Sequence, residues 1–339
     1  MGDMEHRRFI YPVGQGGFSV ERLEDFVVVF DCGSVSSPQV VEKWINELQK
    51  RTNHVNVLFI SHFDNDHVNS IRYLLSKIKV LKAVTAFIPK ELRTAYSVYT
   101  NGVYTSIMGM LTGNDVETEY VGDGEVSNKR FFHREVWEWI AKSMMSPVDF
   151  GSVKAILQNQ KNIVLRQLEE SQEYLESKRQ DINDAFKVVF GPKGPNSKGL
   201  IVLSQKCKDI ETQLSLIYQG CEWCHKSPSR LASFQSSCLY VGDADLKNRS
   251  NKKDVKDFLN KYRSERSLML MQIPHHGSKY NVGAWFEMDF STKYYFVNDI
   301  TVSRIQANTK LYNSLMGQNK LLYVGDQCQD MIVTETKIK

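Results

Sequence analysis

The sequence predicts an α/β layered domain interrupted by a helical insertion. Strand and helix signals alternate over residues 1–90, which is typical of layered α/β domains. Ligand-type side chains also follow several apolar runs that suit buried strands, so these side chains would meet at one edge of a sheet. Residues 91–184 differ, because Glu, Gln, Lys and Leu dominate there and β-branched runs are few. This stretch is therefore interpreted as the insertion.

Residues 1–90 are predicted to form the N-terminal half of the layered domain. Val41, Trp44 and Leu48 recur at helical spacing, whereas Val55–Ile60 is a continuous apolar run of the kind found in buried strands. The expected order is strand Phe9–Val13, a glycine turn, strand Phe26–Phe30, helix Pro38–Gln49, strand Val55–Ile60, helix Asn69–Lys79 and strand Ala83–Ile88.

The rest of the chain completes the predicted domain. Within the insertion at 91–184, Phe131–Met144 and Val153–Ile182 are expected to be helical. Residues 185–339 form the predicted C-terminal half of the layered domain. Strands are expected there at Phe186–Phe190, Leu200–Leu203, Ser237–Val241 and Leu268–Ile273.

A smaller insertion is predicted at residues 205–237, between two strands of the C-terminal half. It carries Cys207, Cys221, Cys224 and His225, a set of residues that would suit a small zinc knuckle. An ordinary surface loop is the alternative, and it is the favoured interpretation.

Composition restricts the class of protein. With 43 basic and 39 acidic residues the net charge is +4, which permits contact with phosphate groups but does not predict it. The N-terminal MGDMEHRRF lacks the apolar core of a signal peptide, and the run Phe26–Phe30 is far too short to span a bilayer. We expect a soluble cytoplasmic protein without membrane contact, whose six irregularly spaced cysteines are reduced.

A cluster of ligand-type side chains follows Val55–Ile60 directly and consists of His62, Asp64, Asp66 and His67. Crowding at the exit of a strand lets these side chains converge on a small volume, where a divalent ion would relieve the repulsion between carboxylates. The alternative is a polar turn in which Asp66 or Asn69 caps the following helix. The metal site is the favoured interpretation.

Two later strands also end in ligand-type residues. Asp243 follows Ser237–Val241 and is the candidate carboxylate to bridge two ions. His275 and His276 follow Leu268–Ile273. Because neighbours on an extended chain point to opposite sides, only one of these histidines is expected to bind metal, and His276 is favoured. His275 is left either as a catalytic proton donor or substrate contact, or as a histidine that only supports the ligands.

A two-metal centre of this kind indicates hydrolysis. Water bound to zinc has its pKa lowered to roughly 7, so a metal-bound hydroxide becomes available as the nucleophile. Asp66 could orient that hydroxide as a catalytic residue, and the ions would offset charge on a phosphoryl or acyl centre. Two divalent ions are expected, with zinc as the default and manganese left open by the carboxylate-rich ligand set.

These motifs together resemble the metallo-β-lactamase superfamily, specifically the soluble hydrolase domain of ComEC-type competence proteins. Four segments carry the resemblance in the expected order. They are the opening pair VGQGGFSV and VVVFDCGS, the motif SHFDNDHVNS, the stretch FKVVFGPKGPNSKGLIVL, and the closing motifs YVGDAD and IPHHGS. Asp64 stands where most superfamily members have histidine, which is usual for this branch.

The resemblance implies an αββα sandwich with a binuclear metal site at one edge. It also implies hydrolysis of a phosphodiester, with DNA or another nucleic acid as the expected substrate. Asn69 and Ser70 stand where a glycine pair is common, and Asn196 is the candidate for the place of a mid-chain histidine, so one ion could be held weakly. Standalone members of the branch are also associated with bacterial antiviral defence.

Three residues are candidate substrate contacts, namely Asn196, Ser278 and Lys279. For Lys279 the alternative is a solvated lysine. Residues 247–266 carry eight basic and three acidic side chains, and this basic segment could guide a phosphate backbone towards the metals. An amphipathic helix with a solvated basic face accounts for the same pattern.

Three hypotheses of function follow from these observations. The leading one is a metal-dependent phosphodiesterase or nuclease. The second is a hydrolase of a small nucleotide or signalling molecule, in which the insertion at 91–184 covers a closed pocket. The third is a non-catalytic module that binds a protein partner through that insertion, with the metals only stabilising the fold.

Overall fold

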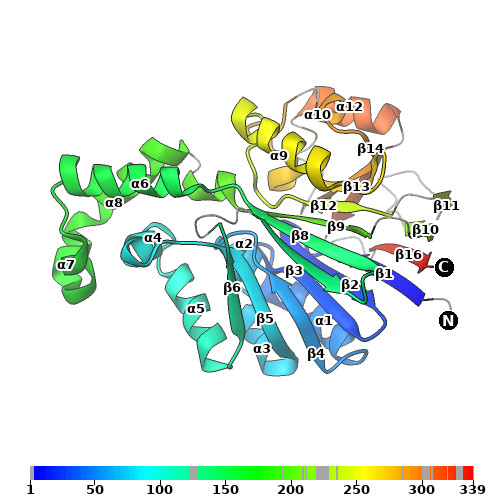
Figure 1. Cartoon of the computed structure of the whole chain (residues 1–339), viewed down its shortest axis with the longest axis horizontal. Coiled ribbons are helices and arrows are strands. Elements are labelled where there is room, and N and C mark those ends of the chain that lie inside the picture. The colour runs from blue at the N-terminus through cyan, green and yellow to red at the C-terminus, as the bar shows by residue number, and fades with distance from the viewer. Residues whose placement is uncertain are drawn as a thin grey trace.

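The computed structural model describes residues 4–122, 128–192, 194–207, 210, 212–218, 229–233, 236–283, 286–299, 306, 308–318, 320–325 and 331–338. Two β-sheets lie face to face, and helices cover the outer face of each sheet (Figure 1). The layers therefore follow the order helix, sheet, sheet, helix, as predicted.

The first sheet has nine strands among the described residues, in the order β11-β10-β16-β1-β2-β3-β4-β5-β6. From β3 to β6 neighbouring strands are parallel, so their C-terminal ends share one edge of the sheet. The strands are β1 (Met4–Ile10), β2 (Gly16–Leu23), β3 (Phe26–Ser34), β4 (His54–Phe59), β5 (Lys79–Ala86), β6 (Glu117–Val121), β10 (Thr212–Tyr218), β11 (Ser229–Ser233) and β16 (Ile332–Ile338).

The second sheet has seven strands within the same part of the chain, in the order β15-β14-β13-β12-β9-β8-β7. Here β12 to β15 are parallel to one another, so a second set of strand ends lies at one edge. The strands are β7 (Asn128–His133), β8 (Trp137–Ser143), β9 (Leu200–Lys206), β12 (Cys238–Tyr240), β13 (Leu268–Gln272), β14 (Thr292–Asp299) and β15 (Leu321–Gly325).

Helices occupy three places in Figure 1. Over the first sheet lie α1 (Pro38–Gln49), α2 (Asn65–Val68), α3 (Ile71–Lys77) and α5 (Val103–Gly113), and over the second lie α9 (Arg249–Tyr262), α10 (Phe286–Asp289) and α12 (Thr309–Gly317). The others form a lobe to one side, made of α4 (Arg93–Tyr99), α6 (Pro147–Ala155), α7 (Leu165–Glu170) and α8 (Gln172–Phe190). Short turns include η1 (Lys90–Leu92), the π-helical η2 (Ile156–Gln160), η3 (Gly194–Lys198) and η5 (Pro274–Gly277).

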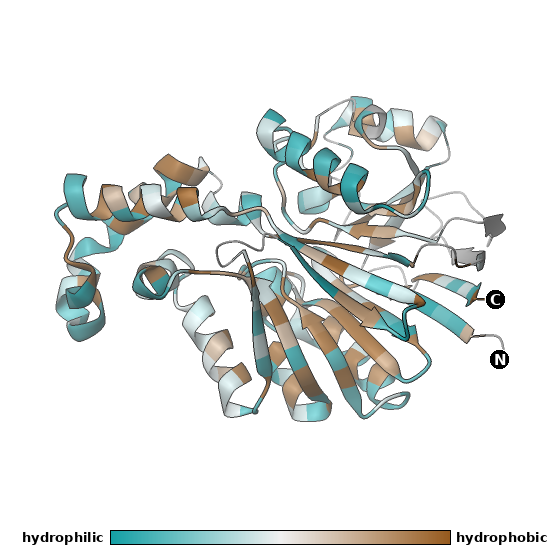
Figure 2. Cartoon of the chain, viewed as in Figure 1, coloured by the Kyte–Doolittle hydropathy of each residue, from teal (hydrophilic) through white to brown (hydrophobic). Residues whose placement is uncertain are grey.

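Apolar side chains fill the spaces between the layers. Between the sheets, Phe30, Phe59 and Trp139 are buried together, and Phe30 stacks on Tyr240 of the second sheet with ring centroids 3.8 Å apart. Two further apolar clusters join each sheet to its helices. Figure 2 shows the same distribution, with hydrophobic strands inside and a hydrophilic outer face on α9.

The helical lobe packs onto the loop that follows β4. Phe63 in that loop contacts Tyr96 of α4 edge to face, at 6.2 Å between ring centroids, and Tyr96 also lies 5.9 Å from Phe186 of α8. Because these rings belong to one apolar cluster, the lobe holds the segment that carries His62 to His67.

The structure corrects several sequence predictions, including the helical insertion at 91–184, because β6, β7 and β8 lie within it and belong to the two sheets. Phe131–Met144, predicted helical, forms most of the antiparallel pair β7 and β8. Trp137 and Trp139 alternate inward on β8 and are fully buried, so cross-strand packing decides against a helix. Phe186–Phe190, predicted as a strand, is the last turn of α8. Phe186 and Phe190 are buried four residues apart on one helical face.

The chain leaves the second sheet between β9 and β12, which are antiparallel neighbours. In between, β10 and β11 pair at the edge of the first sheet, so the segment predicted as a small insertion contributes strands. Cys221, Cys224 and His225 lie outside the described residues. Among the described residues, the structure has no helix with the length and apolarity needed to cross a bilayer.

Candidate metal centre

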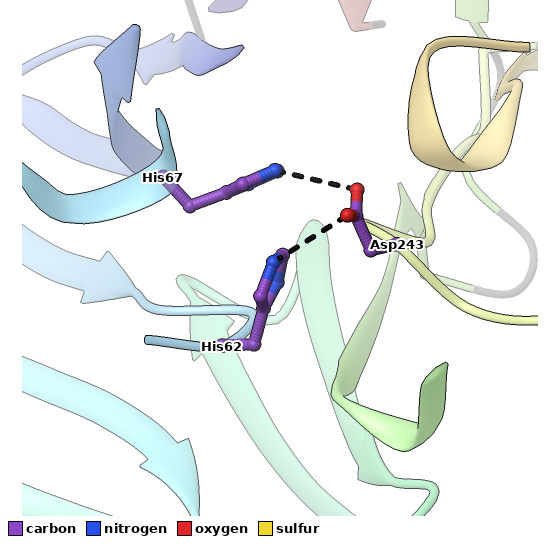
Figure 3. A group of neighbouring side chains, drawn as sticks. All are labelled: His62, His67 and Asp243. Atoms are coloured by element: carbon purple, nitrogen blue, oxygen red, sulfur yellow. Dashed lines mark ion pairs between the residues drawn. The ribbon is translucent and has the colours of Figure 1, made fainter. Parts of the chain in front are cut away.

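Four separate segments deliver ligand-type side chains to one edge of the sandwich. The loop after β4 carries His62 and Asp64, and α2 carries Asp66 and His67. From the second sheet, Asp243 follows β12, and Figure 3 shows its carboxylate facing both His62 and His67. The turn η5 after β13 adds His275 and His276. All these segments follow strands that end at the shared edge.

Asp243 is central to the cluster. Its Oδ1 lies 3.4 Å from Nε2 of His67, and its Oδ2 lies 3.8 Å from Nε2 of His62 and 3.1 Å from Nδ1 of His275. Each carboxylate oxygen therefore faces a different histidine. Such a placement suits a carboxylate that bridges two ions, the role predicted for Asp243.

Asp66 lies between the other two histidines. Its Oδ2 is 3.4 Å from Nε2 of His276 and 3.9 Å from Nε2 of His67. Two sets of ligand atoms lie within 4.8 Å of one another, namely His62, His67 and Asp243, and Asp66, His67 and His276. The predicted ligands from distant parts of the chain are thus brought together.

Asp64 lies at the exposed side of this cluster. Its Oδ2 is 3.7 Å from Nε2 of His62, and its side chain is 43% exposed, whereas that of His62 is 1% exposed. Asp64 is within reach of the same histidine nitrogen that Asp243 faces.

The three buried histidines are held by the ring nitrogen that points away from the cluster. Nδ1 of His67 lies 2.8 Å from a carboxylate oxygen of Asp31, and Nδ1 of His276 lies 2.6 Å from the backbone oxygen of Asn298. Nδ1 of His62 lies 2.9 Å from Oγ of Ser61, which itself donates to Asp31 at 2.8 Å. Because these acceptors leave Nδ1 as the donor, each Nε2 keeps its lone pair.

Those Nε2 atoms have no hydrogen-bond partner in the described residues. Nε2 of His62, His67 and His276 and Oδ1 of Asp243 are buried without a partner. Unpaired buried polar atoms are costly, and here four of them belong to one cluster of imidazoles and carboxylates. The residues therefore fit divalent cations bound at the two sets of ligand atoms, which together would satisfy these four atoms.

Electrostatics agree with a site built for positive charge. Burial lowers the pKa of His67, but the charges of Asp31 and Asp66 outweigh burial and hold that pKa well above its usual value. Burial raises the pKa of Asp243, but the neighbouring imidazoles of His275 and His67 hold that pKa well below its usual value. The carboxylates thus favour a cation beside them, and a metal ion is the stronger such cation.

The turn η5 differs from the extended backbone assumed for the histidine pair. His275 and His276 have φ values of 49° and 54°, in the left-handed region that non-glycine residues rarely adopt. Neighbouring side chains therefore do not point to opposite sides here, as they would on an extended strand. Both rings reach carboxylates of the cluster. His276 is buried while the side chain of His275 is 34% exposed, so His275 lies at the rim.

Close backbone approach explains the glycine cluster near the N-terminus. A Cβ atom on Gly17 would lie 2.7 Å from Cβ of Asp31 and 3.1 Å from Nδ1 of His67. No side chain fits there, so β2 can pass directly behind the pair that orients His67. Gly16 and Gly17, expected in a glycine turn, are thus the first residues of β2, and Gly17 supports the site.

The predicted substrate contacts lie around the cluster. Asn196 lines a pocket with Asp64, and its Oδ1 is buried without a hydrogen-bond partner in the described residues. Oγ of Ser278 accepts from the backbone of Tyr280, and Lys279 is exposed with its Nζ 5.6 Å from the ring of Tyr280. Contact of these three with substrate stays a prediction.

The basic segment 247–266 contains α9. This helix is amphipathic, which was the alternative interpretation of the basic pattern. Val255, Phe258 and Leu259 are buried beneath it. Lys252 and Lys256 pair with Asp289 of α10 at 2.8 and 3.0 Å, so part of its positive charge is already neutralised. A role in guiding substrate remains a prediction.

Asp31, Ser61 and Asn298 were missed by sequence reasoning. One signal was available for Asp31, because it directly follows the apolar run Phe26–Phe30, as the other ligand-type residues follow theirs. Asn298 acts through its backbone oxygen, which no side-chain pattern can reveal.

Comparison with known proteins adds a match over the first part of the chain. The family model described as Metallo-beta-lactamase superfamily matches residues 19–138, which include His62, Asp64, Asp66 and His67. A search among curated proteins gives no significant match.

Several solved structures are similar at low sequence identity. The chain is 7% identical to zinc-bound PqqB from Methylobacterium extorquens, covering 95% of this chain and 98% of that one with a TM-score of 0.47. The chain is 8% identical to YhfI from Bacillus subtilis, covering 95% of this chain and 94% of that one with a TM-score of 0.41. The chain is 16% identical to the peroxy diiron form of the chemotaxis sensor ODP, covering 42% of this chain and 52% of that one with a TM-score of 0.28. A further similar structure is the apo state of ODP from T. denticola. The chain thus spans about half the length of ODP, and likenesses this distant support no conclusion about function.

Proposed function

We propose, because a family model of the metallo-β-lactamase superfamily matches residues 19–138 and the chain has the predicted αββα layers, that this protein is a metal-dependent hydrolase acting on a phosphodiester in a nucleic acid. The predicted fold class is confirmed, and the family model supports the superfamily over residues 19–138, whereas the ComEC-type branch remains a prediction. A role in antiviral defence likewise stays an expectation of that resemblance.

One observation carries the proposal. Three buried histidines each have Nδ1 held by a hydrogen bond and Nε2 left without a partner among the described residues, beside two aspartates. A purely structural histidine would use both nitrogens or leave one in solvent. Divalent ions bound there would supply Lewis-acid charge and lower the pKa of water.

The side chains have separable roles. Asp243 faces His62 and His67 with different oxygens and would hold two ions at a fixed spacing. Asp66 is buried beside His67 and His276 and would orient the attacking water as a hydrogen-bond acceptor. His275 is at the rim with Nδ1 near Asp243, so it can carry a proton to a leaving oxygen or contact the substrate.

The identity of the ions is part of the proposal. Asp64, Asp66 and Asp243 give a carboxylate-rich set beside three buried histidines, which suits zinc and leaves manganese possible on chemical grounds. Elemental analysis of the purified protein, followed by reconstitution with each ion, decides between them.

Substitution of the central carboxylate tests the function. Asp243→Ala should lower metal content and reduce hydrolysis of single-stranded DNA by on the order of 10²–10³-fold, because the bridging ligand and its charge are lost. Asp254→Ala, an exposed aspartate on α9, is the matched control and should retain both. Full turnover in Asp243→Ala would refute a metal-dependent mechanism at this site.

A second candidate function has its own observation. Residues of the helical lobe line a pocket that includes Asp64, which would suit a small nucleotide or signalling molecule. Turnover on single-stranded DNA, duplex DNA and cyclic nucleotides separates the two candidates. A protein that binds no metal and keeps its thermal stability in chelator would instead favour the partner-binding module, with the lobe as the partner's site.

A further inference from the structure

A polar pocket lies beside Asp64 where the helical lobe meets the candidate metal centre. The lobe contributes Asn183 and Lys187 from α8 and Asn101 from the turn between α4 and α5. The turn η3 contributes Asn196. Side chains from α8, from the turn between α4 and α5, and from η3 thus converge next to one candidate ligand.

A second pocket continues the first. It shares Asn65, Asn101 and Val103 with the pocket beside Asp64, and it extends to Arg72 of α3. The two pockets therefore join into one groove that runs past the turn at Asp64 and Asn65. We call it the lobe groove.

Each part of the lobe groove contains a cation that is not neutralised by the protein. Lys187 and Arg72 are exposed, and within the described part of the chain neither side chain has an ion pair, a hydrogen bond or a ring contact. By contrast, Lys252 and Lys256 on α9 share Asp289, and Lys198 pairs with Asp149. Free cations suit phosphate groups of a ligand.

The neutral lining of the lobe groove adds hydrogen-bonding groups. Oδ1 of Asn196 is buried and has no hydrogen-bond partner among the described residues, so it is an acceptor without a donor. Nucleobase amino groups and sugar hydroxyls are donors of the right kind. The amides of Asn101 and Asn183 line the same space.

We propose that the lobe groove binds a single-stranded phosphodiester chain, with Lys187 and Arg72 contacting phosphates on either side of the nucleotide that Asn196 contacts. Two cations in two joined pockets match a strand with repeated phosphates better than a molecule with one phosphate. This assignment rests on the proposed function, because the strand would pass Asp64 on its way to the metals.

Binding of an uncleavable strand tests the assignment without measuring catalysis. A fluorescein-labelled single-stranded phosphorothioate oligonucleotide is titrated with the purified protein at several salt concentrations, and anisotropy gives the affinity. Lys187→Ala and Arg72→Ala should each weaken binding by about five-fold at 0.1 M salt and reduce the salt slope by about 0.7, the value for one phosphate contact on a single strand. Lys178→Ala, which removes a lysine stacked on Tyr174 in the same helix, is the control and should change neither.

The outcomes separate the groove from the proposed function. Unchanged salt slopes in both groove variants, or an equal loss in Lys178→Ala, would overturn the groove. Competition by thymidine 5′-monophosphate that depends on Lys187 alone, with Arg72→Ala like wild type, would overturn the strand in favour of a single nucleotide. Binding that depends on both cations, in a protein that hydrolyses no phosphodiester, would support the groove while refuting the proposed function.

Discussion

Hydrogen bonds at Nδ1 decide what the histidines of the cluster can do. Asp31 accepts from His67 directly and from Ser61, which in turn contacts His62. One carboxylate therefore orients two candidate ligands at once. Groups that orient ligand histidines commonly change metal affinity by about 10–100-fold when they are removed.

Asp31→Asn is the corresponding prediction. The amide keeps the size of the carboxylate but loses the charge and one acceptor, so metal affinity should fall by roughly 10–100-fold with little loss of secondary structure. Competition with a chromophoric chelator measures the affinity, and Asp254→Asn on the exposed face of α9 serves as the control. Wild-type affinity in Asp31→Asn would show that Asp31 has no part in holding the ions.

His275 and His276 both have left-handed backbone conformations. Each costs roughly 1–2 kcal/mol relative to ordinary backbone, so the surrounding structure must hold both residues in this conformation. The conformation directs both rings towards carboxylates of the cluster. Both histidines can be identified from the motif IPHHGS in the sequence, without knowledge of their backbone conformation.

At the scale of elements, the turn η3 joins the lobe to the second sheet. Gly194 has a φ of 64°, and a Cβ atom there would lie 1.7 Å from Oη of Tyr99. The turn can therefore approach α4 only because this residue has no side chain. That approach brings Asn196 into the lobe groove.

Gly194→Ala should consequently destabilise the protein. The left-handed backbone and the contact with Tyr99 together should lower the free energy of unfolding by about 1–3 kcal/mol. Gly151→Ala is the matched control, since this glycine lies within α6 and its Cβ would meet nothing within 4 Å. In helix α6 the alanine should stabilise by about 0.5–1 kcal/mol. Denaturant unfolding measures both, and equal effects would contradict the assigned role of Gly194.

Element types were predictable where a local pattern has one meaning. The alternation from β3 through α1 to β4 has clear spacing, and the structure reproduces it. Phe131–Met144 and Phe186–Phe190 were predicted wrongly because their aromatic residues fit either a strand or a helix. Partners distant in sequence decided them, as β8 pairs with β9 while Phe186 packs against Tyr96.

At the scale of the whole molecule, a buried polar network joins the two sheets. Glu21 of β2 accepts hydrogen bonds from Arg8 of β1 at 2.6 Å and from Trp139 and Tyr240 of the second sheet at 2.7 and 2.9 Å. His6 also contacts this carboxylate at 3.0 Å and stacks on Trp137. The side chains of Arg8 and Glu21 are 0% exposed, so the charges depend on each other.

Removing one partner from this network should therefore strongly lower the free energy of unfolding. Glu21→Ala leaves Arg8 buried without its counter-ion and is expected to cost about 3–5 kcal/mol of unfolding free energy. Glu5→Ala on the neighbouring strand, where the salt bridge to Arg7 is partly exposed, should cost less than about 1 kcal/mol. Similar losses in the two variants would show that the network contributes little.

The same network predicts acid sensitivity. Burial lowers the pKa of His6 more than the hydrogen bond to Glu21 raises it. The unfolded chain then binds more protons, so stability should fall as pH drops below about 6.5. Burial alone would raise the pKa of Glu21, but Arg8 and His6 depress it overall, which adds a further loss below about 4.3.

Unfolding in denaturant at pH 8, 6.5 and 5 measures this slope. His6→Gln keeps a donor for Glu21 but cannot titrate, so its stability should depend less on pH by up to about 1.4 kcal/mol per pH unit. The difference between the pH profiles of the wild type and His6→Gln gives the contribution of His6, because the histidines of the metal cluster are the same in both proteins. Parallel pH profiles would contradict the assignment to His6.

The linear order of residues was enough to identify the ligand-type side chains, the fold class and most strands, because strand exits, helical spacing and short motifs are local patterns. Folding in three dimensions decided which ligand-type side chains lie together, how Asp31 and Asn298 orient the histidines, and that Lys187 and Arg72 line joined pockets. Those relations join residues far apart in the chain, and their energies come from burial and pairing that exist only after the sheets and the lobe have packed together.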